Sequence, residues 1–167
     1  LLLLIVLFVN VFSKKQLKWA KMAAWVFIIL IALSAAYHLY GLVIRWYISG
    51  HAPWSNAYES MVYIAFATML AGFIFIRNSK ITLAATAILA ALILWVASLN
   101  WMNPTITNLV PVLDSYWLMI HVAIITASYG FLGLAAIMAI FNLFMLIFRT
   151  EKNKESVTLT IKELTYI

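Results

Sequence analysis

The sequence predicts an all-α fold: a polytopic transmembrane helix bundle of about five spans. Of the 167 residues, 66% are hydrophobic and only 10% are charged, whereas soluble domains carry roughly a quarter charged residues. The apolar residues also gather in long blocks with short polar links between them. A block of about 20 apolar residues crosses the hydrocarbon core as one helix. We therefore expect residues 1–167 to form a single membrane-embedded domain.

Five apolar blocks predict the spans in chain order. The chain starts inside the first block, so we expect a first helix that is cut short and a chain that is a piece of a longer protein. The last block would be about 50 Å long at about 1.5 Å per residue. A hydrocarbon core is only about 30 Å thick, so this helix should project from the membrane. The predicted spans are residues 1–12, 22–46, 60–76, 81–99 and 116–148.

The polar link before the third span contains helix-start signals. Asn56, with Glu59 three residues later, resembles a capping box, and Pro53 interrupts the loop before it. Arg45 lies near the end of the second span, on the same membrane surface as Glu59. An ion pair between Arg45 and Glu59 would close this loop.

The positive charges predict the orientation of the bundle. All but one of the 11 basic residues lie in the link 13–21, in the link 77–80 or in the tail from residue 149; Arg45 is the exception. By the positive-inside rule these three regions face the cytoplasm. The links 47–59 and 100–115 then face outward, which in a bacterium is the periplasm. The net charge of +6 is thus a topology signal, and we expect membrane lipid, not nucleic acid, around the chain.

The residue types exclude several kinds of chemistry. There is no cysteine, which excludes disulfides, a cysteine zinc site and a thiol nucleophile within this chain. All three histidines fall on the predicted outer side. His121 lies about 40 Å from the inner end of the last helix, roughly 10 Å beyond the hydrocarbon core. His38 lies just inside the outer boundary, and His51 lies in the outer link.

Histidines at one depth favour imidazole as an axial ligand, and haem suits them because aromatic side chains are at hand to line a site. His121, one turn after Trp117, is either such a ligand or a polar interfacial residue. His38 is more typical of a helix-packing histidine than of a ligand, and His51 of structural hydrogen bonding in a turn. The outer aromatic residues are also typical of an interfacial belt. They are Trp46, Tyr47, Trp54, Tyr58, Trp101, Tyr116 and Trp117.

Two further features each have two interpretations. Arg45 is suited to the ion pair with Glu59 and equally to bidentate hydrogen bonds with a haem propionate. Gly130 and Gly133, with the alanines that follow, form a small-residue stripe. Such a stripe is typical of close helix packing in lipid, and the alternative is the wall of a cofactor channel.

Two stretches resemble a known family. RWYISGHAPWSNAYES (45–60) and LVPVLDSYWLMIHVAIITASYGFLGL (109–134) resemble the CcsA (ResC) proteins of the system II cytochrome c maturation pathway. The resemblance implies transport of haem b to the outer face and its presentation to apocytochrome c. It also implies a CcsB (ResB) partner or a fused B half, and a place in a holocytochrome c synthase (haem lyase). In this family the histidine that corresponds to His121 binds the haem iron.

The resemblance also implies what this stretch lacks. The tryptophan-rich WWD segment, the second external histidine and a later transmembrane histidine all lie downstream of these motifs, so the stretch alone is expected to be inactive. The expected haem-binding residues here are His121, Trp117, Arg45 and Trp54. The expected location is the bacterial cytoplasmic membrane, with a plastid thylakoid membrane as the alternative. A cytochrome b-like electron-transfer subunit is the alternative function, although it usually needs histidine pairs at two depths.

Overall fold

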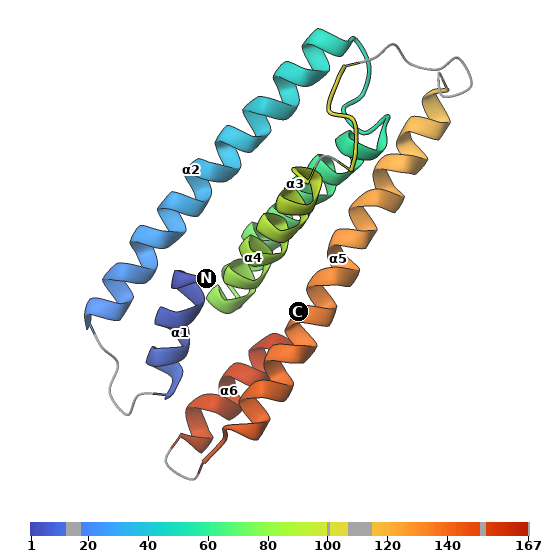
Figure 1. Cartoon of the computed structure of the whole chain (residues 1–167). Coiled ribbons are helices and arrows are strands. Elements are labelled where there is room, and N and C mark those ends of the chain that lie inside the picture. The colour runs from blue at the N-terminus through green and yellow to red at the C-terminus, as the bar shows by residue number, and fades with distance from the viewer. Residues whose placement is uncertain (13–17, 100, 107–114, 151–152, 167) are drawn as a thin grey trace.

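The computed structural model describes residues 1–12, 18–99, 101–106, 115–150 and 153–166, which form six α-helices and no strand. Helices α2, α3, α4 and α5 are each long and apolar enough to cross a membrane, and α1 is a shorter apolar helix. The predicted all-α polytopic bundle is therefore confirmed (Figure 1). The helices are α1 (Leu2–Phe12), α2 (Lys18–Ser49), α3 (Ala57–Phe75), α4 (Lys80–Ala97), α5 (Tyr116–Ile147) and α6 (Lys154–Thr165).

The four long helices alternate in direction. Helices α3 and α4 form an antiparallel pair in the middle, with α2 on one side and α5 on the other (Figure 1). Gly72 of α3 lies so close to Thr86 of α4 that a Cβ on the glycine would clash. Gly130 of α5 meets Thr68 of α3 in the same way. Close helix packing at the small-residue stripe is thus confirmed, and it centres the bundle on α3.

Helix α2 is longer than the predicted span 22–46. It runs from Lys18 to Ser49, and at 32 residues it equals α5 in length. The predicted span 22–46 was therefore too short at both ends. Hydropathy marks the part of a helix that lies in hydrocarbon, whereas helical hydrogen bonds continue through interfacial residues such as Lys18, Trp19 and Tyr47.

The polar tail contains a helix that the sequence analysis did not predict. Helix α6 buries Val157, Thr160 and Leu164, which lie on one face at spacings of three and four residues. It packs against α5 and α1. Its polar residues lower the average hydropathy, and the apolar face becomes recognisable only when the surface that it covers is known.

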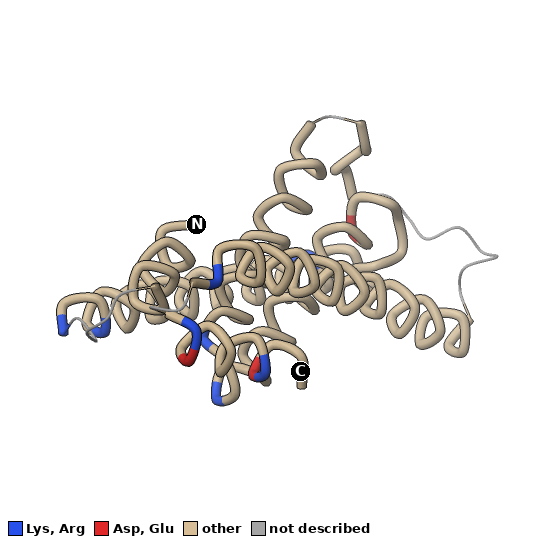
Figure 2. Tube along the Cα trace, turned by 90° about the horizontal axis from the view of Figure 1, so that it is seen from below, with Lys and Arg blue, Asp and Glu red and all other residues tan. Residues whose placement is uncertain are grey.

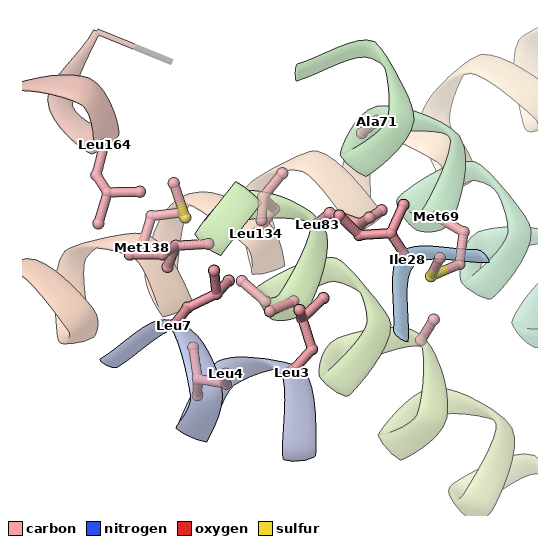
Figure 3. Close-up of a cluster of buried hydrophobic side chains, with 14 of the residues drawn as sticks. Leu3, Leu4, Leu7, Ile28, Met69, Ala71, Leu83, Leu134, Met138 and Leu164 are labelled. Atoms are coloured by element: carbon pink, nitrogen blue, oxygen red, sulfur yellow. The ribbon is translucent and has the colours of Figure 1, made fainter. Parts of the chain in front are cut away.

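The buried core includes the place where α1 and α6 join the bundle. Leu3, Leu4 and Leu7 of α1 are buried among side chains of α4, α5 and α6 (Figure 3). Helix α2 contributes little to this core, since only four of its residues are buried. They are Ala20, Ala24, Ile28 and Leu42.

The described basic residues confirm that the three basic regions share one end. The start of α2, the α3–α4 link, the start of α4 and the end of α5 all lie at the same end of the bundle (Figure 1). Figure 2 shows the molecule from below, with most of its lysines and arginines toward one end. Lys14, Lys15 and Lys152 lie outside the described residues. At this end are Lys18, Lys21, Arg77, Lys80, Arg149, Lys154 and Lys162.

Candidate functional site

The loop between α2 and α3 is held by its own hydrogen bonds. Gly50, at φ +69°, supplies the left-handed conformation that lets the chain turn after α2. The Ser49 hydroxyl donates to the His51 carbonyl over 2.9 Å, and the Ser55 hydroxyl donates to the Ala52 carbonyl over 2.7 Å. Nδ1 of His51 lies 3.2 Å from the same Ala52 carbonyl oxygen. The structural interpretation of His51 is thereby confirmed.

The start of α3 is capped as predicted, with one difference. The Glu59 N–H donates to Oδ1 of Asn56 over 2.8 Å, so Asn56 is the N-cap. In a capping box the glutamate would accept from the N-cap N–H. Here Glu59 Oε2 accepts instead from the N–H of Ser55, over 3.0 Å. The carboxylate therefore binds the N–H of Ser55, the residue before the N-cap, and not the N–H of the N-cap itself.

Arg45 joins three segments at the end of the bundle opposite the basic residues. Its Nε donates to Glu59 Oε1 over 3.0 Å, and its Nη1 donates to the Pro104 carbonyl over 3.0 Å. The guanidinium also lies 5.2 Å from the Tyr58 ring centroid. The Glu59 side chain has 0% exposure, so the predicted ion pair is confirmed and is buried on the acid's side. Nη2 of Arg45 is buried and has no partner among the described residues, so the propionate interpretation stays a prediction.

Trp54 connects the loop to the outer end of α5. Its indole Nε1 donates to the Met119 carbonyl over 3.1 Å, two residues before His121. The ring packs against Tyr63 at a centroid distance of 4.8 Å and against Trp46 at 6.1 Å. Trp54 thus fixes the position of the helix segment that carries His121.

His121 is exposed in the second turn of α5. No hydrogen bond to its ring is present among the described residues. Trp117, one turn earlier on the same face, is 76% exposed and packs edge-to-face with Tyr116 at 5.8 Å. Asp114, which precedes this helix, lies outside the described residues. The imidazole and the indole therefore form an open surface on the outer part of α5.

The expected site residues fall into two groups. Arg45 lies in the ion-pair cluster and lines a cavity between α2, α3 and α4. Trp54 lies between that cluster and α5, whereas His121 and Trp117 lie on the exposed side of α5. The structure thus brings Arg45 and Trp54 to the same loop, and it links Trp54 to His121 only through the backbone of Met119.

His38 packs as predicted, but one of its ring nitrogens differs from the prediction. Its ring packs edge-to-face with Phe66 at 5.8 Å, as expected of a helix-packing histidine. Its Nε2, however, is buried without a partner among the described residues, so the histidine is not satisfied.

Among the described residues no three histidine or carboxylate groups come together to hold a metal ion. Haem needs fewer ligands, because its porphyrin already supplies four nitrogens and the protein adds axial ligands only. An exposed, unbonded imidazole beside an exposed indole fits that need.

Comparison with known proteins identifies the family of the chain. The sequence matches the family described as Cytochrome C assembly protein over residues 54–167. Protein NrfI of Wolinella succinogenes is 48% identical over 114 residues, which are 68% of this chain and 13% of that protein. Cytochrome c biogenesis protein CcsA of Chlorella vulgaris is 39% identical over 104 residues, 59% of this chain and 33% of that protein. CcsA of Prochlorococcus marinus (strain MIT 9303) is 34% identical over 120 residues, 70% of this chain and 38% of that protein.

The chain spans well under half the length of these relatives, from 13% to 38%. The family match, in contrast, covers about two thirds of the chain and includes α3, α4, α5 and α6. It contains Trp54, Glu59, Trp117 and His121. With that coverage, and with relatives named for cytochrome c biogenesis, the chain belongs to the cytochrome c assembly protein family.

Proposed function

We propose that this chain is part of a protein that handles haem for cytochrome c biogenesis, and that His121 is an axial ligand of haem at the outer face. The main support is the exposed His121 imidazole, which has no hydrogen-bond partner among the described residues. Because the chain belongs to the cytochrome c assembly family, haem is the ligand that we assign to this imidazole. The cargo we assign is haem b.

Each outer residue has a distinct role in this proposal. Trp117 lies against the porphyrin face beside His121, because the two side chains share one side of α5. Trp54 is a positioning residue that acts through the Met119 carbonyl. Arg45 has Nη2 left over after its bonds to Glu59 and Pro104, and this N–H donates to a propionate.

The location and the partners follow from the same proposal. The bundle lies in a bacterial cytoplasmic membrane, with its basic end in the cytoplasm and His121 on the periplasmic side. A CcsB-like partner or fused B half delivers the cargo, and apocytochrome c receives it. Haem, when bound, supplies the vinyl groups to which the apocytochrome thiols add. The chain's own residues hold and orient it, so that the reacting groups meet in one geometry.

The experiment that tests this proposal is the substitution His121→Ala in the full-length protein. We expect the outer haem to be lost and the yield of mature cytochrome c to fall at least about tenfold, because one iron ligand is missing. Added imidazole should restore part of that yield by filling the vacated ligand position. Haem absorption spectra of the purified protein and a haem stain for cytochrome c are the two measurements.

The matched control is Ile125→Ala, one turn further along the same face of α5. This substitution removes an exposed side chain but no ligand, so the yield should stay near the wild-type level. An unchanged cytochrome c yield in His121→Ala without imidazole would refute the assignment.

The cytochrome b-like alternative gains no specific support. Electron transfer across the bilayer uses haems at two depths. The three histidines of this chain are all in its outer half, with His51 in the loop after α2 and His121 near the start of α5.

A further inference from the structure

One corner of the basic end carries positive charge without a neighbouring acid. This basic corner is formed by the start of α2, the link between α3 and α4, and the start of α4, which lie at the same end of the bundle (Figure 1). Residues 1–113 contain a single acidic residue, Glu59, which is paired with Arg45 at the opposite end. The cations of the basic corner are Lys18, Lys21, Arg77 and Lys80.

A cation–π contact joins the two parts of the basic corner. Nζ of Lys80, the first residue of α4, lies 5.0 Å from the ring centroid of Trp25 on α2. Lys21 comes four residues before Trp25, and Lys18 three residues before Lys21, so the three side chains share one face of α2. Arg77 precedes Lys80 by three residues in the link. The lysines of α2 and α4 therefore converge on one indole.

No acidic side chain neutralises these cations. Lys18, Lys21 and Arg77 are exposed and Lys80 is half-buried, and none of them forms an ion pair within the described part of the chain. Like charges three or four residues apart on one helix face repel each other. An anion placed between α2 and α4 would replace that repulsion with charge-assisted hydrogen bonds.

The surface next to the basic corner favours a lipid over a soluble anion. Helix α2 has 32 residues and is about 48 Å long, whereas the hydrocarbon core is about 30 Å thick, so its lysine-bearing end extends to the headgroups. Trp19 and Trp25 are more than half exposed there, as is typical of tryptophan at the membrane interface. The exposed surface of α2 continues with Met22, Val26 and Ile29, which suit acyl chains.

We propose that the basic corner binds an anionic phospholipid. Lys21 and Lys80 donate to its phosphate, Trp25 lies at the level of the glycerol, and the acyl chains run along the exposed apolar face of α2. Only four residues of α2 are buried, so a headgroup that bridges α2 and α4 adds a link where the protein itself provides few. This inference goes beyond the proposed function, because it does not depend on haem.

The test uses the full-length protein, delipidated in a non-ionic detergent, and measures phosphatidylglycerol binding by native mass spectrometry. We expect phosphatidylglycerol to bind more tightly than phosphatidylcholine, with an affinity that falls as salt rises. Lys21→Gln and Lys80→Gln should each weaken binding about fivefold, the contribution of one cation at an anionic headgroup. Lys80→Arg keeps the charge and should bind as the wild type does.

The matched control is Lys162→Gln, which removes the same charge from an exposed position on α6, next to Glu163 and outside the basic corner. Its affinity for phosphatidylglycerol should be unchanged. Equal losses in Lys162→Gln and Lys80→Gln would show that net charge alone attracts the lipid, and would refute the site. Equal affinities for the two lipids, or displacement of phosphatidylglycerol by inorganic phosphate, would refute it as well. Size-exclusion profiles and helical circular dichroism identify any variant that fails to fold.

Discussion

At the scale of single residues, the loop between α2 and α3 depends on one buried acid. Glu59 is fully buried and makes three interactions: it accepts from Arg45 Nε and from the Ser55 N–H, and its own N–H is capped by Asn56. Each bond ties a different segment to the start of α3. The carboxylate therefore holds the loop that places Trp54 against α5.

We predict that Glu59→Gln destabilises the protein by about 3 kcal/mol, because it leaves the Arg45 guanidinium without a counter-charge in a largely buried position. The measurement is thermal unfolding in detergent micelles. The control is Glu155→Gln, at an exposed position in the first turn of α6, which should change stability by about 0.5 kcal/mol or less. Equal effects of the two substitutions would contradict the structural role of Glu59.

At the scale of helices, small residues decide how closely the elements pack. Gly72 brings α3 against Thr86 of α4, and Gly130 brings α5 against Thr68 of α3. In lipid the helices gain little from hydrophobic burial, so close contact between their backbones supplies much of the attraction. Helix α2 has no such contact at Gly41, and the cavity opens on that side.

We predict that Gly130→Ala lowers stability by about 1–3 kcal/mol, because the added methyl group collides with Thr68 and forces α5 away from α3. Gly41→Ala is the paired control. Its methyl group enters open space, and alanine favours the helix over glycine by about 1 kcal/mol, so stability should be unchanged or higher. Thermal unfolding in detergent compares the two. A Gly130→Ala protein as stable as wild type would show that α5 packs elsewhere.

At the scale of the whole molecule, charge is distributed along the bundle axis. The basic residues gather at the end where α2 and α4 begin, together with α1 and α6 (Figures 1 and 2). His121, Trp117 and the loop of Glu59 lie at the opposite end. The basic residues and the candidate ligand surface thus lie at opposite ends of the bundle.

We predict opposite accessibility for the two ends in intact cells. This chain has no cysteine, so single cysteines are reporters once any in the rest of the protein are replaced. Thr105→Cys, exposed after α4, should react with a membrane-impermeant maleimide, because the positive-inside rule places it outside. Asn78→Cys, exposed in the α3–α4 link, should react only after permeabilisation. The reverse pattern would place His121 in the cytoplasm and remove the basis of its assigned role.

The sequence by itself determined the features that depend on local free energies. Transfer of an apolar block into lipid is nearly additive along the chain, so the spans could be predicted without knowing their neighbours. The Asn56 cap involves only residues three apart, and the charge rule needs only positions in the sequence. Even the Arg45–Glu59 ion pair could be proposed from the sequence, because the two residues lie at the facing ends of two consecutive helices.

Only the tertiary structure decided the features that depend on packing between distant segments. The Pro104 carbonyl at Arg45, the Met119 carbonyl at Trp54 and the docked face of α6 all come from residues far away in sequence. The same holds for the cavity and for the unpaired Nε2 of His38. Whether a buried nitrogen finds a partner depends on how far one helix lies from the next, and no local pattern in the sequence sets that distance.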